Sequence, residues 1–552
     1  MPPWERHMRR STVLGEYLLT KLHDAGVRHI FGVPGDYVLR FYQQIGTSPL
    51  CHVGTTREDT AAFAADGYAR CSGIGAVAVT YGVGALNVVN AVAGAYAEAS
   101  PVVVISGGPG LKERRDDPLI HHRFGPFDFQ RQIFERITVA AEVLDDPLTA
   151  ARQIDRALFL ARTHSKPVYL ELPRDQVETP LASLAEVRPE VAPDDGESRR
   201  EAVVETVQLL AAAERPVLLL GVELHRGALQ DAVVELIGRL GTPVAATLTG
   251  KSVVGERHPD YLGVYEGAMG SVVAKEVVES ADLLVVLGVR FNDVDLGIYT
   301  AQLDPYHIVR ATSEEVFISH HRYQNVGLEA FIRDLSVAID RRERGGGVAS
   351  PGPSAPDFPR PDAPIRVERL IARINELLTP DLRVICDVGD CLFAAVDLRV
   401  HQRSGFLASA YYTSMGFAMP AAVGAHFAQP GQGPLVLVGD GAFQMTGTEI
   451  STLARHGVAA IVVVFNNAGY STERFILDGP FNDIAQWRFH HVGDLVGNVQ
   501  GFDVATEADF ESAWQRAVAT RDRPSLLNVH LAPDDGSPAM RRLAGVLREK
   551  AV

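Results

Sequence analysis

Residues 435–476 read LVLVGDGAFQMTGTEISTLARHGVAAIVVVFNNAGYSTERFI, and this stretch decides the fold. An apolar run over 435–438 ends in Gly439-Asp440-Gly441, a helical pattern follows, and a second apolar run over 460–465 ends in Asn466-Asn467. This order predicts a strand, a crossover helix and a second, parallel strand. Asp440 and Asn467 are therefore expected at the carboxyl ends of two strands of one sheet, the edge at which open α/β sheets bind ligands.

The side chains at these two strand ends suit a magnesium ion. A carboxylate, a side-chain amide oxygen and nearby backbone carbonyls are hard oxygen ligands, and Mg²⁺ is usually completed by phosphate oxygens and water. Glycines in the unit let backbone N–H groups approach such phosphates closely. A lone Gly-Asp-Gly is most often a turn, so the interpretation depends on the whole strand-helix-strand unit.

Composition excludes several classes of protein. The 552 residues predict about three or four domains, and 46% hydrophobic with 22% charged residues are typical of soluble globular proteins. A formal net charge of −16 argues against a nucleic-acid partner. The four cysteines lack metal-ligand spacing, Glu16 interrupts the N-terminal apolar run, and no 18-residue apolar run occurs. We therefore expect a cytoplasmic protein with free thiols, no signal peptide and no membrane span.

Two linkers divide the chain. The segment 188–199 is proline-rich and charged, and the segment 341–364 is rich in glycine and proline. They separate three blocks, 1–187, 200–340 and 365–552, that alternate apolar runs with helical patterns. The predicted fold class is α/β, with three doubly wound parallel-sheet domains that suggest duplication of one architecture. The expected strands lie at 29–32, 76–80, 102–105, 217–220, 244–247, 283–287, 384–386, 435–438 and 460–465.

Two short motifs resemble nucleotide-binding sequences but each lacks a required residue. The stretch LTGKS at 248–252 ends like a phosphate loop, but Ala245 stands where that loop needs glycine. Gly82-Val83-Gly84 is half of a dinucleotide fingerprint, and Asn87 occupies its third glycine position. Both are expected to be strand-to-helix turns.

The first block carries groups that exchange protons. Asp36 follows a Pro-Gly turn and by itself predicts a turn residue or helix N-cap. Glu58 opens an alanine-rich helical stretch, where an acidic residue usually interacts with the helix dipole. His121-His122 is one of three histidine pairs, so the pair alone carries little information.

Taken in order, the motifs resemble the pyruvate and indolepyruvate decarboxylase family, which are thiamine diphosphate-dependent 2-keto acid decarboxylases. The order is PGD at 34–36, Glu58 followed by AAFAADGYAR, the pair His121-His122, and then GDG and NN. The resemblance spans essentially the whole chain. It includes TYGVGALNVVNAVAGAYAEASPVVVISG at 80–107, HPDYLGVYEG at 258–267 and SPAMRRL at 537–543.

The resemblance implies non-oxidative decarboxylation of a 2-keto acid to an aldehyde and CO₂ through a carbanion and an enamine of thiamine diphosphate. It implies the three domains of that enzyme type, and Mg²⁺ held by Asp440, Asn467 and the carbonyl of Gly469. Glu58 would bond the cofactor's aminopyrimidine, and Met415 would be the apolar fulcrum that bends the cofactor. Further cofactor contacts would come from Gly389, Asp390, Thr413, Gly441, Ala442 and Tyr470.

Proton handling is assigned by the resemblance to Asp36, His121, His122 and Glu473, the last one helical turn beyond Gly469. The implied substrate pocket comprises Val388, Thr472 and Ile476. Thr472 is smaller than the aliphatic residue that narrows the pocket for pyruvate. Since one or two methylenes in a pocket shift preference by about 1–3 kcal/mol, we expect a bulky substrate: phenylpyruvate, indolepyruvate or a branched-chain 2-keto acid.

The family joins the first and third blocks of different subunits, which implies a homodimer or homotetramer. The chain departs from the family pattern at Arg57, where asparagine is common, and at Thr413, where glycine is frequent. Two alternatives share part of the pattern. A carboligase of the acetolactate synthase type would keep the metal site and Glu58 but lack the histidine pair and Glu473. An inactive, cofactor-binding relative would have lost Glu58 or the proton-handling residues.

Overall fold

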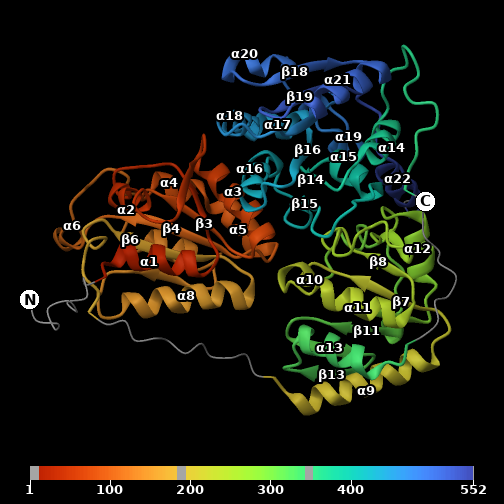
Figure 1. Cartoon of the computed structure of the whole chain (residues 1–552), viewed down its shortest axis with the longest axis horizontal. Coiled ribbons are helices and arrows are strands. Elements are labelled where there is room, and N and C mark those ends of the chain that lie inside the picture. The colour runs from red at the N-terminus through yellow and green to blue at the C-terminus, as the bar shows by residue number, and fades with distance from the viewer. Residues whose placement is uncertain (1–11, 183–193, 342–351, 551–552) are drawn as a thin grey trace, which may run out of the picture. The chain divides into compact units, whose positions relative to one another are not determined.

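The computed structural model of the chain describes residues 12–182, 194–341 and 352–550. Its described strands form three sheets, with helices between most successive strands, as the α/β prediction requires (Figure 1). The chain divides into two compact units. Unit 1 comprises Met1–Glu190 and Pro420–Pro430, and unit 2 comprises Val191–Met419 and Gly431–Val552. Unit 1 holds the first sheet, and unit 2 holds the second and third sheets.

The first sheet has six parallel strands in the order β2-β1-β3-β4-β6-β5. The expected strands at 29–32, 76–80 and 102–105 correspond to β1, β3 and β4. The strand order reverses between β1 and β3, which is where doubly wound sheets open a crevice at their carboxyl edge. The strands are β1 (His29–Gly32), β2 (Cys51–Gly54), β3 (Gly75–Val79), β4 (Val102–Gly108), β5 (Ala141–Val143) and β6 (Val168–Pro173).

Helices cover both faces of this sheet. Helices α1 and α8 share one buried core with Ile30, Ala78 and Val103 of the strands. On the other face, Tyr68 of α3 contacts Phe31 of β1, with ring centroids 5.7 Å apart. Because side chains alternate across a strand, a buried Ile30 followed by a buried Phe31 fits a sheet covered on both sides. The helices are α1 (Leu14–Asp24), α2 (Leu39–Ile45), α3 (Glu58–Ser72), α4 (Val83–Asn87), α5 (Val89–Ala97), α6 (Leu111–Asp116), α7 (Phe129–Phe134), α8 (Ala150–His164) and most of α16 (Ala418–Ala428).

The second sheet has seven strands in the order β13-β12-β11-β10-β7-β8-β9. It departs from the expected parallel arrangement at one edge, where β11, β12 and β13 pair antiparallel. The links 312–314 and 319–320 are too short for a parallel crossover, which needs a dozen or more residues. The strands are β7 (Pro216–Leu220), β8 (Val244–Ala246), β9 (Tyr261–Val264), β10 (Leu283–Leu287), β11 (Ile308–Ala311), β12 (Glu315–Ile318) and β13 (His321–Gln324). The helices are α9 (Gly196–Ala212), α10 (Glu223–Arg226), α11 (Gln230–Leu240), α12 (Val272–Glu279), η2 (Pro305–His307) and α13 (Leu328–Ala338).

The third sheet has six parallel strands in the order β15-β14-β16-β17-β19-β18. Counted along the chain, this is the same strand order as in the first sheet, which supports the duplication that the sequence suggests. The strands are β14 (Leu382–Cys386), β15 (Phe406–Ala408), β16 (Gly433–Gly439), β17 (Ile461–Asn466), β18 (Gln500–Val504) and β19 (Ser525–His530). The helices are α14 (Val367–Leu377), α15 (Asp390–Ala394), η3 (Ala395–Asp397), α17 (Asp440–Thr446), η4 (Gly447–Glu449), α18 (Ile450–Arg455), α19 (Ser471–Ile476), η5 (Pro480–Asn482), η6 (Phe489–His491), α20 (Val492–Val496), α21 (Glu507–Ala519) and α22 (Pro538–Lys550).

The stretch 435–476 forms the predicted strand-helix-strand unit. Strands β16 and β17 are parallel neighbours, with Gly439 paired to Phe465. The crossover is divided into α17, η4 and α18 rather than one continuous helix. Gly447 stands at the division, and glycine is a poor residue inside a helix.

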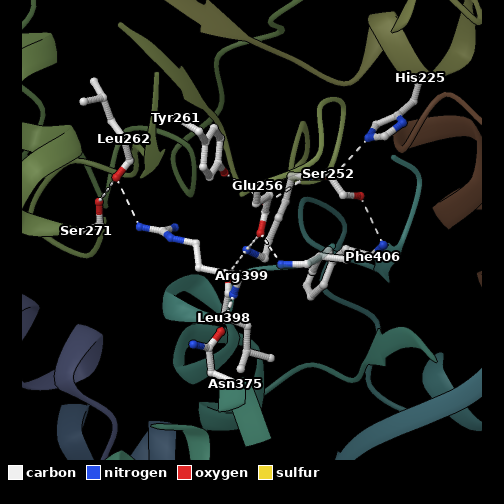
Figure 2. Close-up of polar contacts among 12 residues, drawn as sticks. His225, Ser252, Glu256, Tyr261, Leu262, Ser271, Asn375, Leu398, Arg399 and Phe406 are labelled. Carbon is white, nitrogen blue, oxygen red and sulfur yellow. Dashed lines mark hydrogen bonds and ion pairs between the residues drawn. The ribbon is translucent and has the colours of Figure 1, made fainter. Parts of the chain in front are cut away.

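The motif LTGKS at 248–252 makes an interior contact of unit 2. Lys251 Nζ donates to Glu256 Oε2 at 2.8 Å and to the carbonyl of Leu398 at 2.7 Å, and the charged side chains of Lys251 and Glu256 are fully buried. Glu256 also accepts hydrogen bonds from the hydroxyl of Tyr261 and the N–H of Val400 (Figure 2). Burial lowers the pKa of Lys251, although Glu256 opposes that shift. This lysine links the second sheet to the segment before β15. The motif is not the expected strand-to-helix turn, because β8 is followed by β9 with no helix between them.

The expected linkers fall partly on residues that are not described. The segment 188–199 is described only from residue 194, and α9 begins inside it at Gly196, where Asp195 accepts N–H bonds from the first helical turn. The segment 341–364 is described at 341 and from 352 onward, without a helix or strand in that part. We expect no signal peptide in the N-terminal segment, and residues 1–11 of that segment lie outside the described residues. Among the described helices, none is both long and apolar enough to span a bilayer.

Candidate active site

Asp440 stands at the end of β16, as the first residue of α17. Its carboxylate is buried, with Oδ1 accepting the N–H of Gly441 at 2.8 Å and Oδ2 accepting the N–H of Gly469 at 3.2 Å. Burial raises the pKa of Asp440 from 3.8 to about 6, although these backbone donors favour the charged form. A buried carboxylate held only by neutral donors retains capacity for a cation.

Asn467 completes an oxygen-rich corner with Asp440. It follows β17, the strand beside β16, and only 6% of it is exposed. Its side-chain oxygen Oδ1 has no hydrogen-bond partner among the described residues. Since buried polar atoms normally have partners, a carboxylate and an unpartnered amide oxygen at adjoining strand ends fit a hard cation such as Mg²⁺.

The loop after β17 is shaped by glycine. Gly469 has φ 157°, and a Cβ there would lie 2.1 Å from the carbonyl oxygen of Asn482. At Gly441 a Cβ would lie 2.6 Å from the ring of Tyr470. These close approaches hold the loop against Asp440 and leave no room for a side chain at either position. The predicted contact residues Gly441, Ala442, Gly469 and Tyr470 therefore lie in or beside one packed turn.

Met415 lies in a segment clamped by Asp387, a residue that the sequence did not single out. Asp387 follows β14, is fully buried, and accepts the N–H groups of Gly416 and Ala418, each at 2.8 Å. The hydroxyl of Thr446, at the end of α17, donates to the carbonyl of Gly416 at 2.8 Å. Gly416, directly after Met415, is thus held from both the end of β14 and the end of α17.

The backbone conformation at Thr413 bears on one departure from the family pattern, in which glycine is frequent at this position. Its φ is 54°, in the left-handed region, where a β-branched residue is strongly disfavoured. Glycine adopts this conformation freely, which accounts for a frequent glycine at this position. Thr413 is exposed in this chain.

Two other predicted cofactor contacts begin α15. Gly389 has φ 128°, and Asp390 is the first residue of the helix. Asp390 Oδ2 accepts the N–H of Ser537 at 2.8 Å, whereas Oδ1 has no partner among the described residues. Burial raises the pKa of Asp390 from 3.8 to about 6. The structure thus gives Asp390 a contact with the C-terminal segment, and its cofactor contact stays a prediction.

The predicted pocket residues Thr472 and Ile476 lie on the six-residue helix α19 together with Glu473. Thr472 is half-buried, Glu473 is exposed, and Ile476 is 78% exposed. Val388 is half-buried immediately after β14 and Asp387. The two side chains Thr472 and Ile476 are four residues apart and share one helix face.

In unit 1, Asp36 and the histidine pair come together at the carboxyl edge of the first sheet. Asp36 Oδ2 lies 2.8 Å from Nε2 of His121, and the rings of His121 and His122 have centroids 4.8 Å apart. The hydroxyl of Tyr37 donates to the carbonyl of His121 at 3.2 Å. Three of the four residues expected to handle protons therefore lie together, and their role stays a prediction.

Glu58 is the first residue of α3 and is half-buried. The start of the helix is fixed by Thr60, whose hydroxyl accepts the N–H of Arg57 at 3.3 Å and donates to its carbonyl at 2.8 Å. Asn87 Nδ2 donates to Glu58 Oε2 at 2.8 Å. Asn87, which stands at the third glycine position of the incomplete dinucleotide fingerprint, thus orients the carboxyl group of Glu58. The contact between these two residues is visible only in the folded chain.

The two groups of residues occupy equivalent edges of two sheets. Asp36 and Glu58 follow β1 and β2 in unit 1, whereas Asp387, Asp440 and Asn467 follow β14, β16 and β17 in unit 2. Each group lies where a strand order of this kind places ligands.

Comparisons with known proteins agree with this geometry. Three models of thiamine pyrophosphate enzymes match the chain: the N-terminal TPP binding domain over residues 12–132, the central domain over 203–339 and the C-terminal TPP binding domain over 387–529. An indole-3-pyruvate decarboxylase from Azospirillum brasilense is 37% identical over 93% of this chain and 94% of its own length. An alpha-keto-acid decarboxylase from Mycolicibacterium paratuberculosis (strain ATCC BAA-968 / K-10) is 32% identical over 96% of both chains. Pyruvate decarboxylase 4 from Arabidopsis thaliana is 32% identical over 96% of this chain and 90% of its own.

A solved structure has a similar fold. It is the thiamine diphosphate-dependent 4-hydroxybenzoylformate decarboxylase of Rhodococcus jostii RHA1, with a TM-score of 0.77 and 21% identity. The match covers 95% of this chain and 100% of that one.

Proposed function

Because this chain belongs to the thiamine pyrophosphate enzymes, among their 2-keto acid decarboxylases, we propose that it converts a 2-keto acid with a bulky side chain to an aldehyde and CO₂. The cofactor is thiamine diphosphate, which, when bound, supplies a thiazolium ring that accepts the electrons released with CO₂. The chain's own residues must bind and orient this group and move protons around it.

The observation that carries the decarboxylase proposal is the contact of Asp36 with His121 beside His122. A carboxylate and an imidazole 2.8 Å apart can hold a proton between them and pass it on. Release of an aldehyde needs such a proton donor at the carbon that has lost CO₂. A carboligase of the acetolactate synthase type lacks this histidine pair, so the cluster favours the aldehyde as the product.

Glu58 would hold a proton at its carboxyl group against the cofactor's aminopyrimidine. Asn87 Nδ2 donates to its Oε2 at 2.8 Å. One oxygen of the carboxyl group is therefore oriented by a neighbouring side chain. This arrangement also argues against an inactive relative, since Glu58 and the proton-handling cluster are both retained.

Mg²⁺ is proposed as the second cofactor. The buried Asp440 carboxylate and the unpartnered Oδ1 of Asn467 support a hard cation at this corner. They would hold it together with the carbonyl of Gly469 and bind the diphosphate through it. Met415, held by the clamp on Gly416, would orient the rest of the cofactor.

The preference for a bulky substrate rests on Thr472. It is a small residue on the same face of α19 as Ile476, so it leaves more volume than a larger aliphatic side chain would. We further propose a homodimer or homotetramer, as the resemblance to the decarboxylase family implies, in which Glu58 and Asp440 of one site come from different subunits. A cytoplasmic location is supported by the four cysteines, which form no disulfide in the described part of the chain.

A coupled aldehyde assay across a panel of 2-keto acids tests this function, with and without thiamine diphosphate and Mg²⁺. We expect turnover only with both, and a higher kcat/KM for phenylpyruvate than for pyruvate. Glu58→Gln is expected to lose nearly all turnover and to keep cofactor binding. A longer acyloin or acetohydroxy acid as the main product would favour the carboligase instead.

A further inference from the structure

The cluster Asp36, His121 and His122 has a property that proton handling does not require. One ligand atom from each residue lies within 4.8 Å of the corresponding atom of the other two. Atoms bound tetrahedrally to one Zn²⁺ lie roughly 3.4 Å apart, given metal–ligand lengths of about 2.0–2.2 Å. Small rotations of the side chains therefore suffice for all three to bind one ion.

The chemistry of the three ligands selects the class of ion. Two imidazoles and one carboxylate suit Zn²⁺, Co²⁺ or Ni²⁺, whereas Mg²⁺ prefers oxygen ligands alone. His122 Nδ1 is buried and has no hydrogen-bond partner among the described residues. The side chains of Asp36 and His121 are 41% and 60% exposed in this chain, so an ion from solvent can reach the cluster.

The backbone of the histidine pair is held in place before any ion binds. His122 has φ 65°, a strained value for a residue other than glycine. A Cβ at Gly82 would lie 2.3 Å from the carbonyl oxygen of His122, so the two backbones are in close contact. Gly82 is itself fixed by the fully buried Gln130, whose Oε1 accepts its N–H at 2.7 Å. With the hydroxyl of Tyr37 bound to the carbonyl of His121, the ligands are preorganised.

One neighbouring cation opposes metal binding. Arg174 Nη1 lies 3.8 Å from Asp36 Oδ2. The same guanidinium is paired with Glu113, to which Arg174 Nε donates at 3.1 Å, so much of its charge is already balanced. This arrangement leaves the carboxylate of Asp36 available to an ion.

We propose that Asp36, His121 and His122 form a binding site for one transition-metal dication of the Zn²⁺ class, and that this ion inhibits the enzyme. The bound ion takes the imidazole lone pair and the carboxylate oxygen that would otherwise exchange protons. The binding site stands independently of the proposed function, whereas the inhibition rests on it.

The experiment titrates the assembled holoenzyme, in excess Mg²⁺ and thiamine diphosphate, with ZnCl₂ by calorimetry. We expect one Zn²⁺ per chain and at least about tenfold weaker binding in His121→Ala and in His122→Ala. The matched control is His320→Ala, which alters an exposed member of another histidine pair and should leave binding unchanged. Circular dichroism and melting temperature must match the unaltered protein in all variants.

Unchanged Zn²⁺ affinity in both His121→Ala and His122→Ala would overturn the site. A second measurement follows turnover of the unaltered enzyme as Zn²⁺ is added, and recovery when a chelator selective for zinc over magnesium is supplied. Loss of turnover in step with occupancy supports the inhibitory role, and full turnover at saturation overturns it. If the enzyme turns over no 2-keto acid at all, the proposed function fails while calorimetry still decides the site.

Discussion

The carboxylate of Asp387 accepts the backbone N–H of Gly416 at 2.8 Å, directly after the predicted fulcrum Met415. A second bond, to the N–H of Ala418, uses the other oxygen. The end of β14 therefore determines where the Met415 segment lies.

Asp387→Asn retains the size of the side chain but replaces one carboxylate oxygen by an NH₂ group. That group cannot accept a hydrogen bond from a backbone N–H. We expect at least about a tenfold rise in the thiamine diphosphate concentration needed for half-maximal activity, because the loss of one buried hydrogen bond to a charged group is worth about 1.5–3 kcal/mol. Steady-state titration with the cofactor measures this rise. Asp397→Asn, on the neighbouring turn η3, is the matched control. Equal effects of both variants would mean that the clamp does not position the cofactor.

The buried Asp390 predicts a pH-dependent difference in stability. Its pKa is raised from 3.8 to about 6 in the folded protein, so the folded state binds this proton more tightly than the unfolded state. The contribution of Asp390 is fully present below about pH 4 and is lost as the pH rises through about 6. Asp390→Asn has no carboxyl group to ionise, so its stability does not include this loss. Relative to the unaltered protein, the variant should gain about 2.5 kcal/mol in unfolding free energy between pH 4 and pH 8.

Urea unfolding of both proteins at several pH values measures that gain. Asp381→Asn, an exposed residue before β14, serves as the control and should show no comparable pH dependence. A difference between Asp390→Asn and the unaltered protein that stays constant from pH 4 to pH 8 would contradict the assignment.

Asn87 is expected to act only through Glu58. Asn87→Ala removes the donor to Glu58 Oε2, and we expect about a tenfold fall in kcat/KM, since one hydrogen bond is worth about 0.5–1.5 kcal/mol and more when it reaches a charged group. In the background of Glu58→Gln the same change should have little further effect. A double-mutant cycle on kcat/KM, with cofactor affinity measured separately, tests the coupling. Additive losses would show that Asn87 does not orient Glu58.

Thr472 is expected to set the size of the substrate. Thr472→Ile adds aliphatic volume on α19, so the ratio of kcat/KM for phenylpyruvate to that for pyruvate should fall by about 10- to 200-fold. Thr472→Ser retains a small side chain and should preserve the ratio. Competition between the two 2-keto acids, followed by the aldehydes produced, measures the ratio directly. An unchanged ratio in the isoleucine variant would place size selection elsewhere.

The sequence alone identifies residues whose role follows from their immediate neighbours along the chain. Asp440 and Asn467 were identifiable because each directly follows an apolar run, and parallel strands bring their ends to one edge. The same logic predicted β1, β3, β4, β7, β8, β10 and β14 from their short apolar runs. Asp36 and the histidine pair needed the resemblance to a known family, since each is ambiguous by itself.

Residues that act through distant contacts could not be predicted in this way. Asn87 and Asp387 are informative only once the fold places them against Glu58 and Gly416. The antiparallel edge formed by β12 and β13 was also missed, because strands of four residues give a weak pattern and β13 contains no apolar run. A signal for Asp387 did exist: like Asp440, it is an acidic residue directly after a buried strand.

The claim that Asp440, Asn467 and Glu58 act on one cofactor is tested by a crystal structure of the enzyme grown with thiamine diphosphate and Mn²⁺. The anomalous signal locates the ion. We expect one ion bound by the Asp440 carboxylate, Asn467 Oδ1 and the carbonyl of Gly469, with Glu58 hydrogen-bonded to the aminopyrimidine of the same cofactor. An ion held by other residues, or a cofactor with no contact to Glu58, would contradict it.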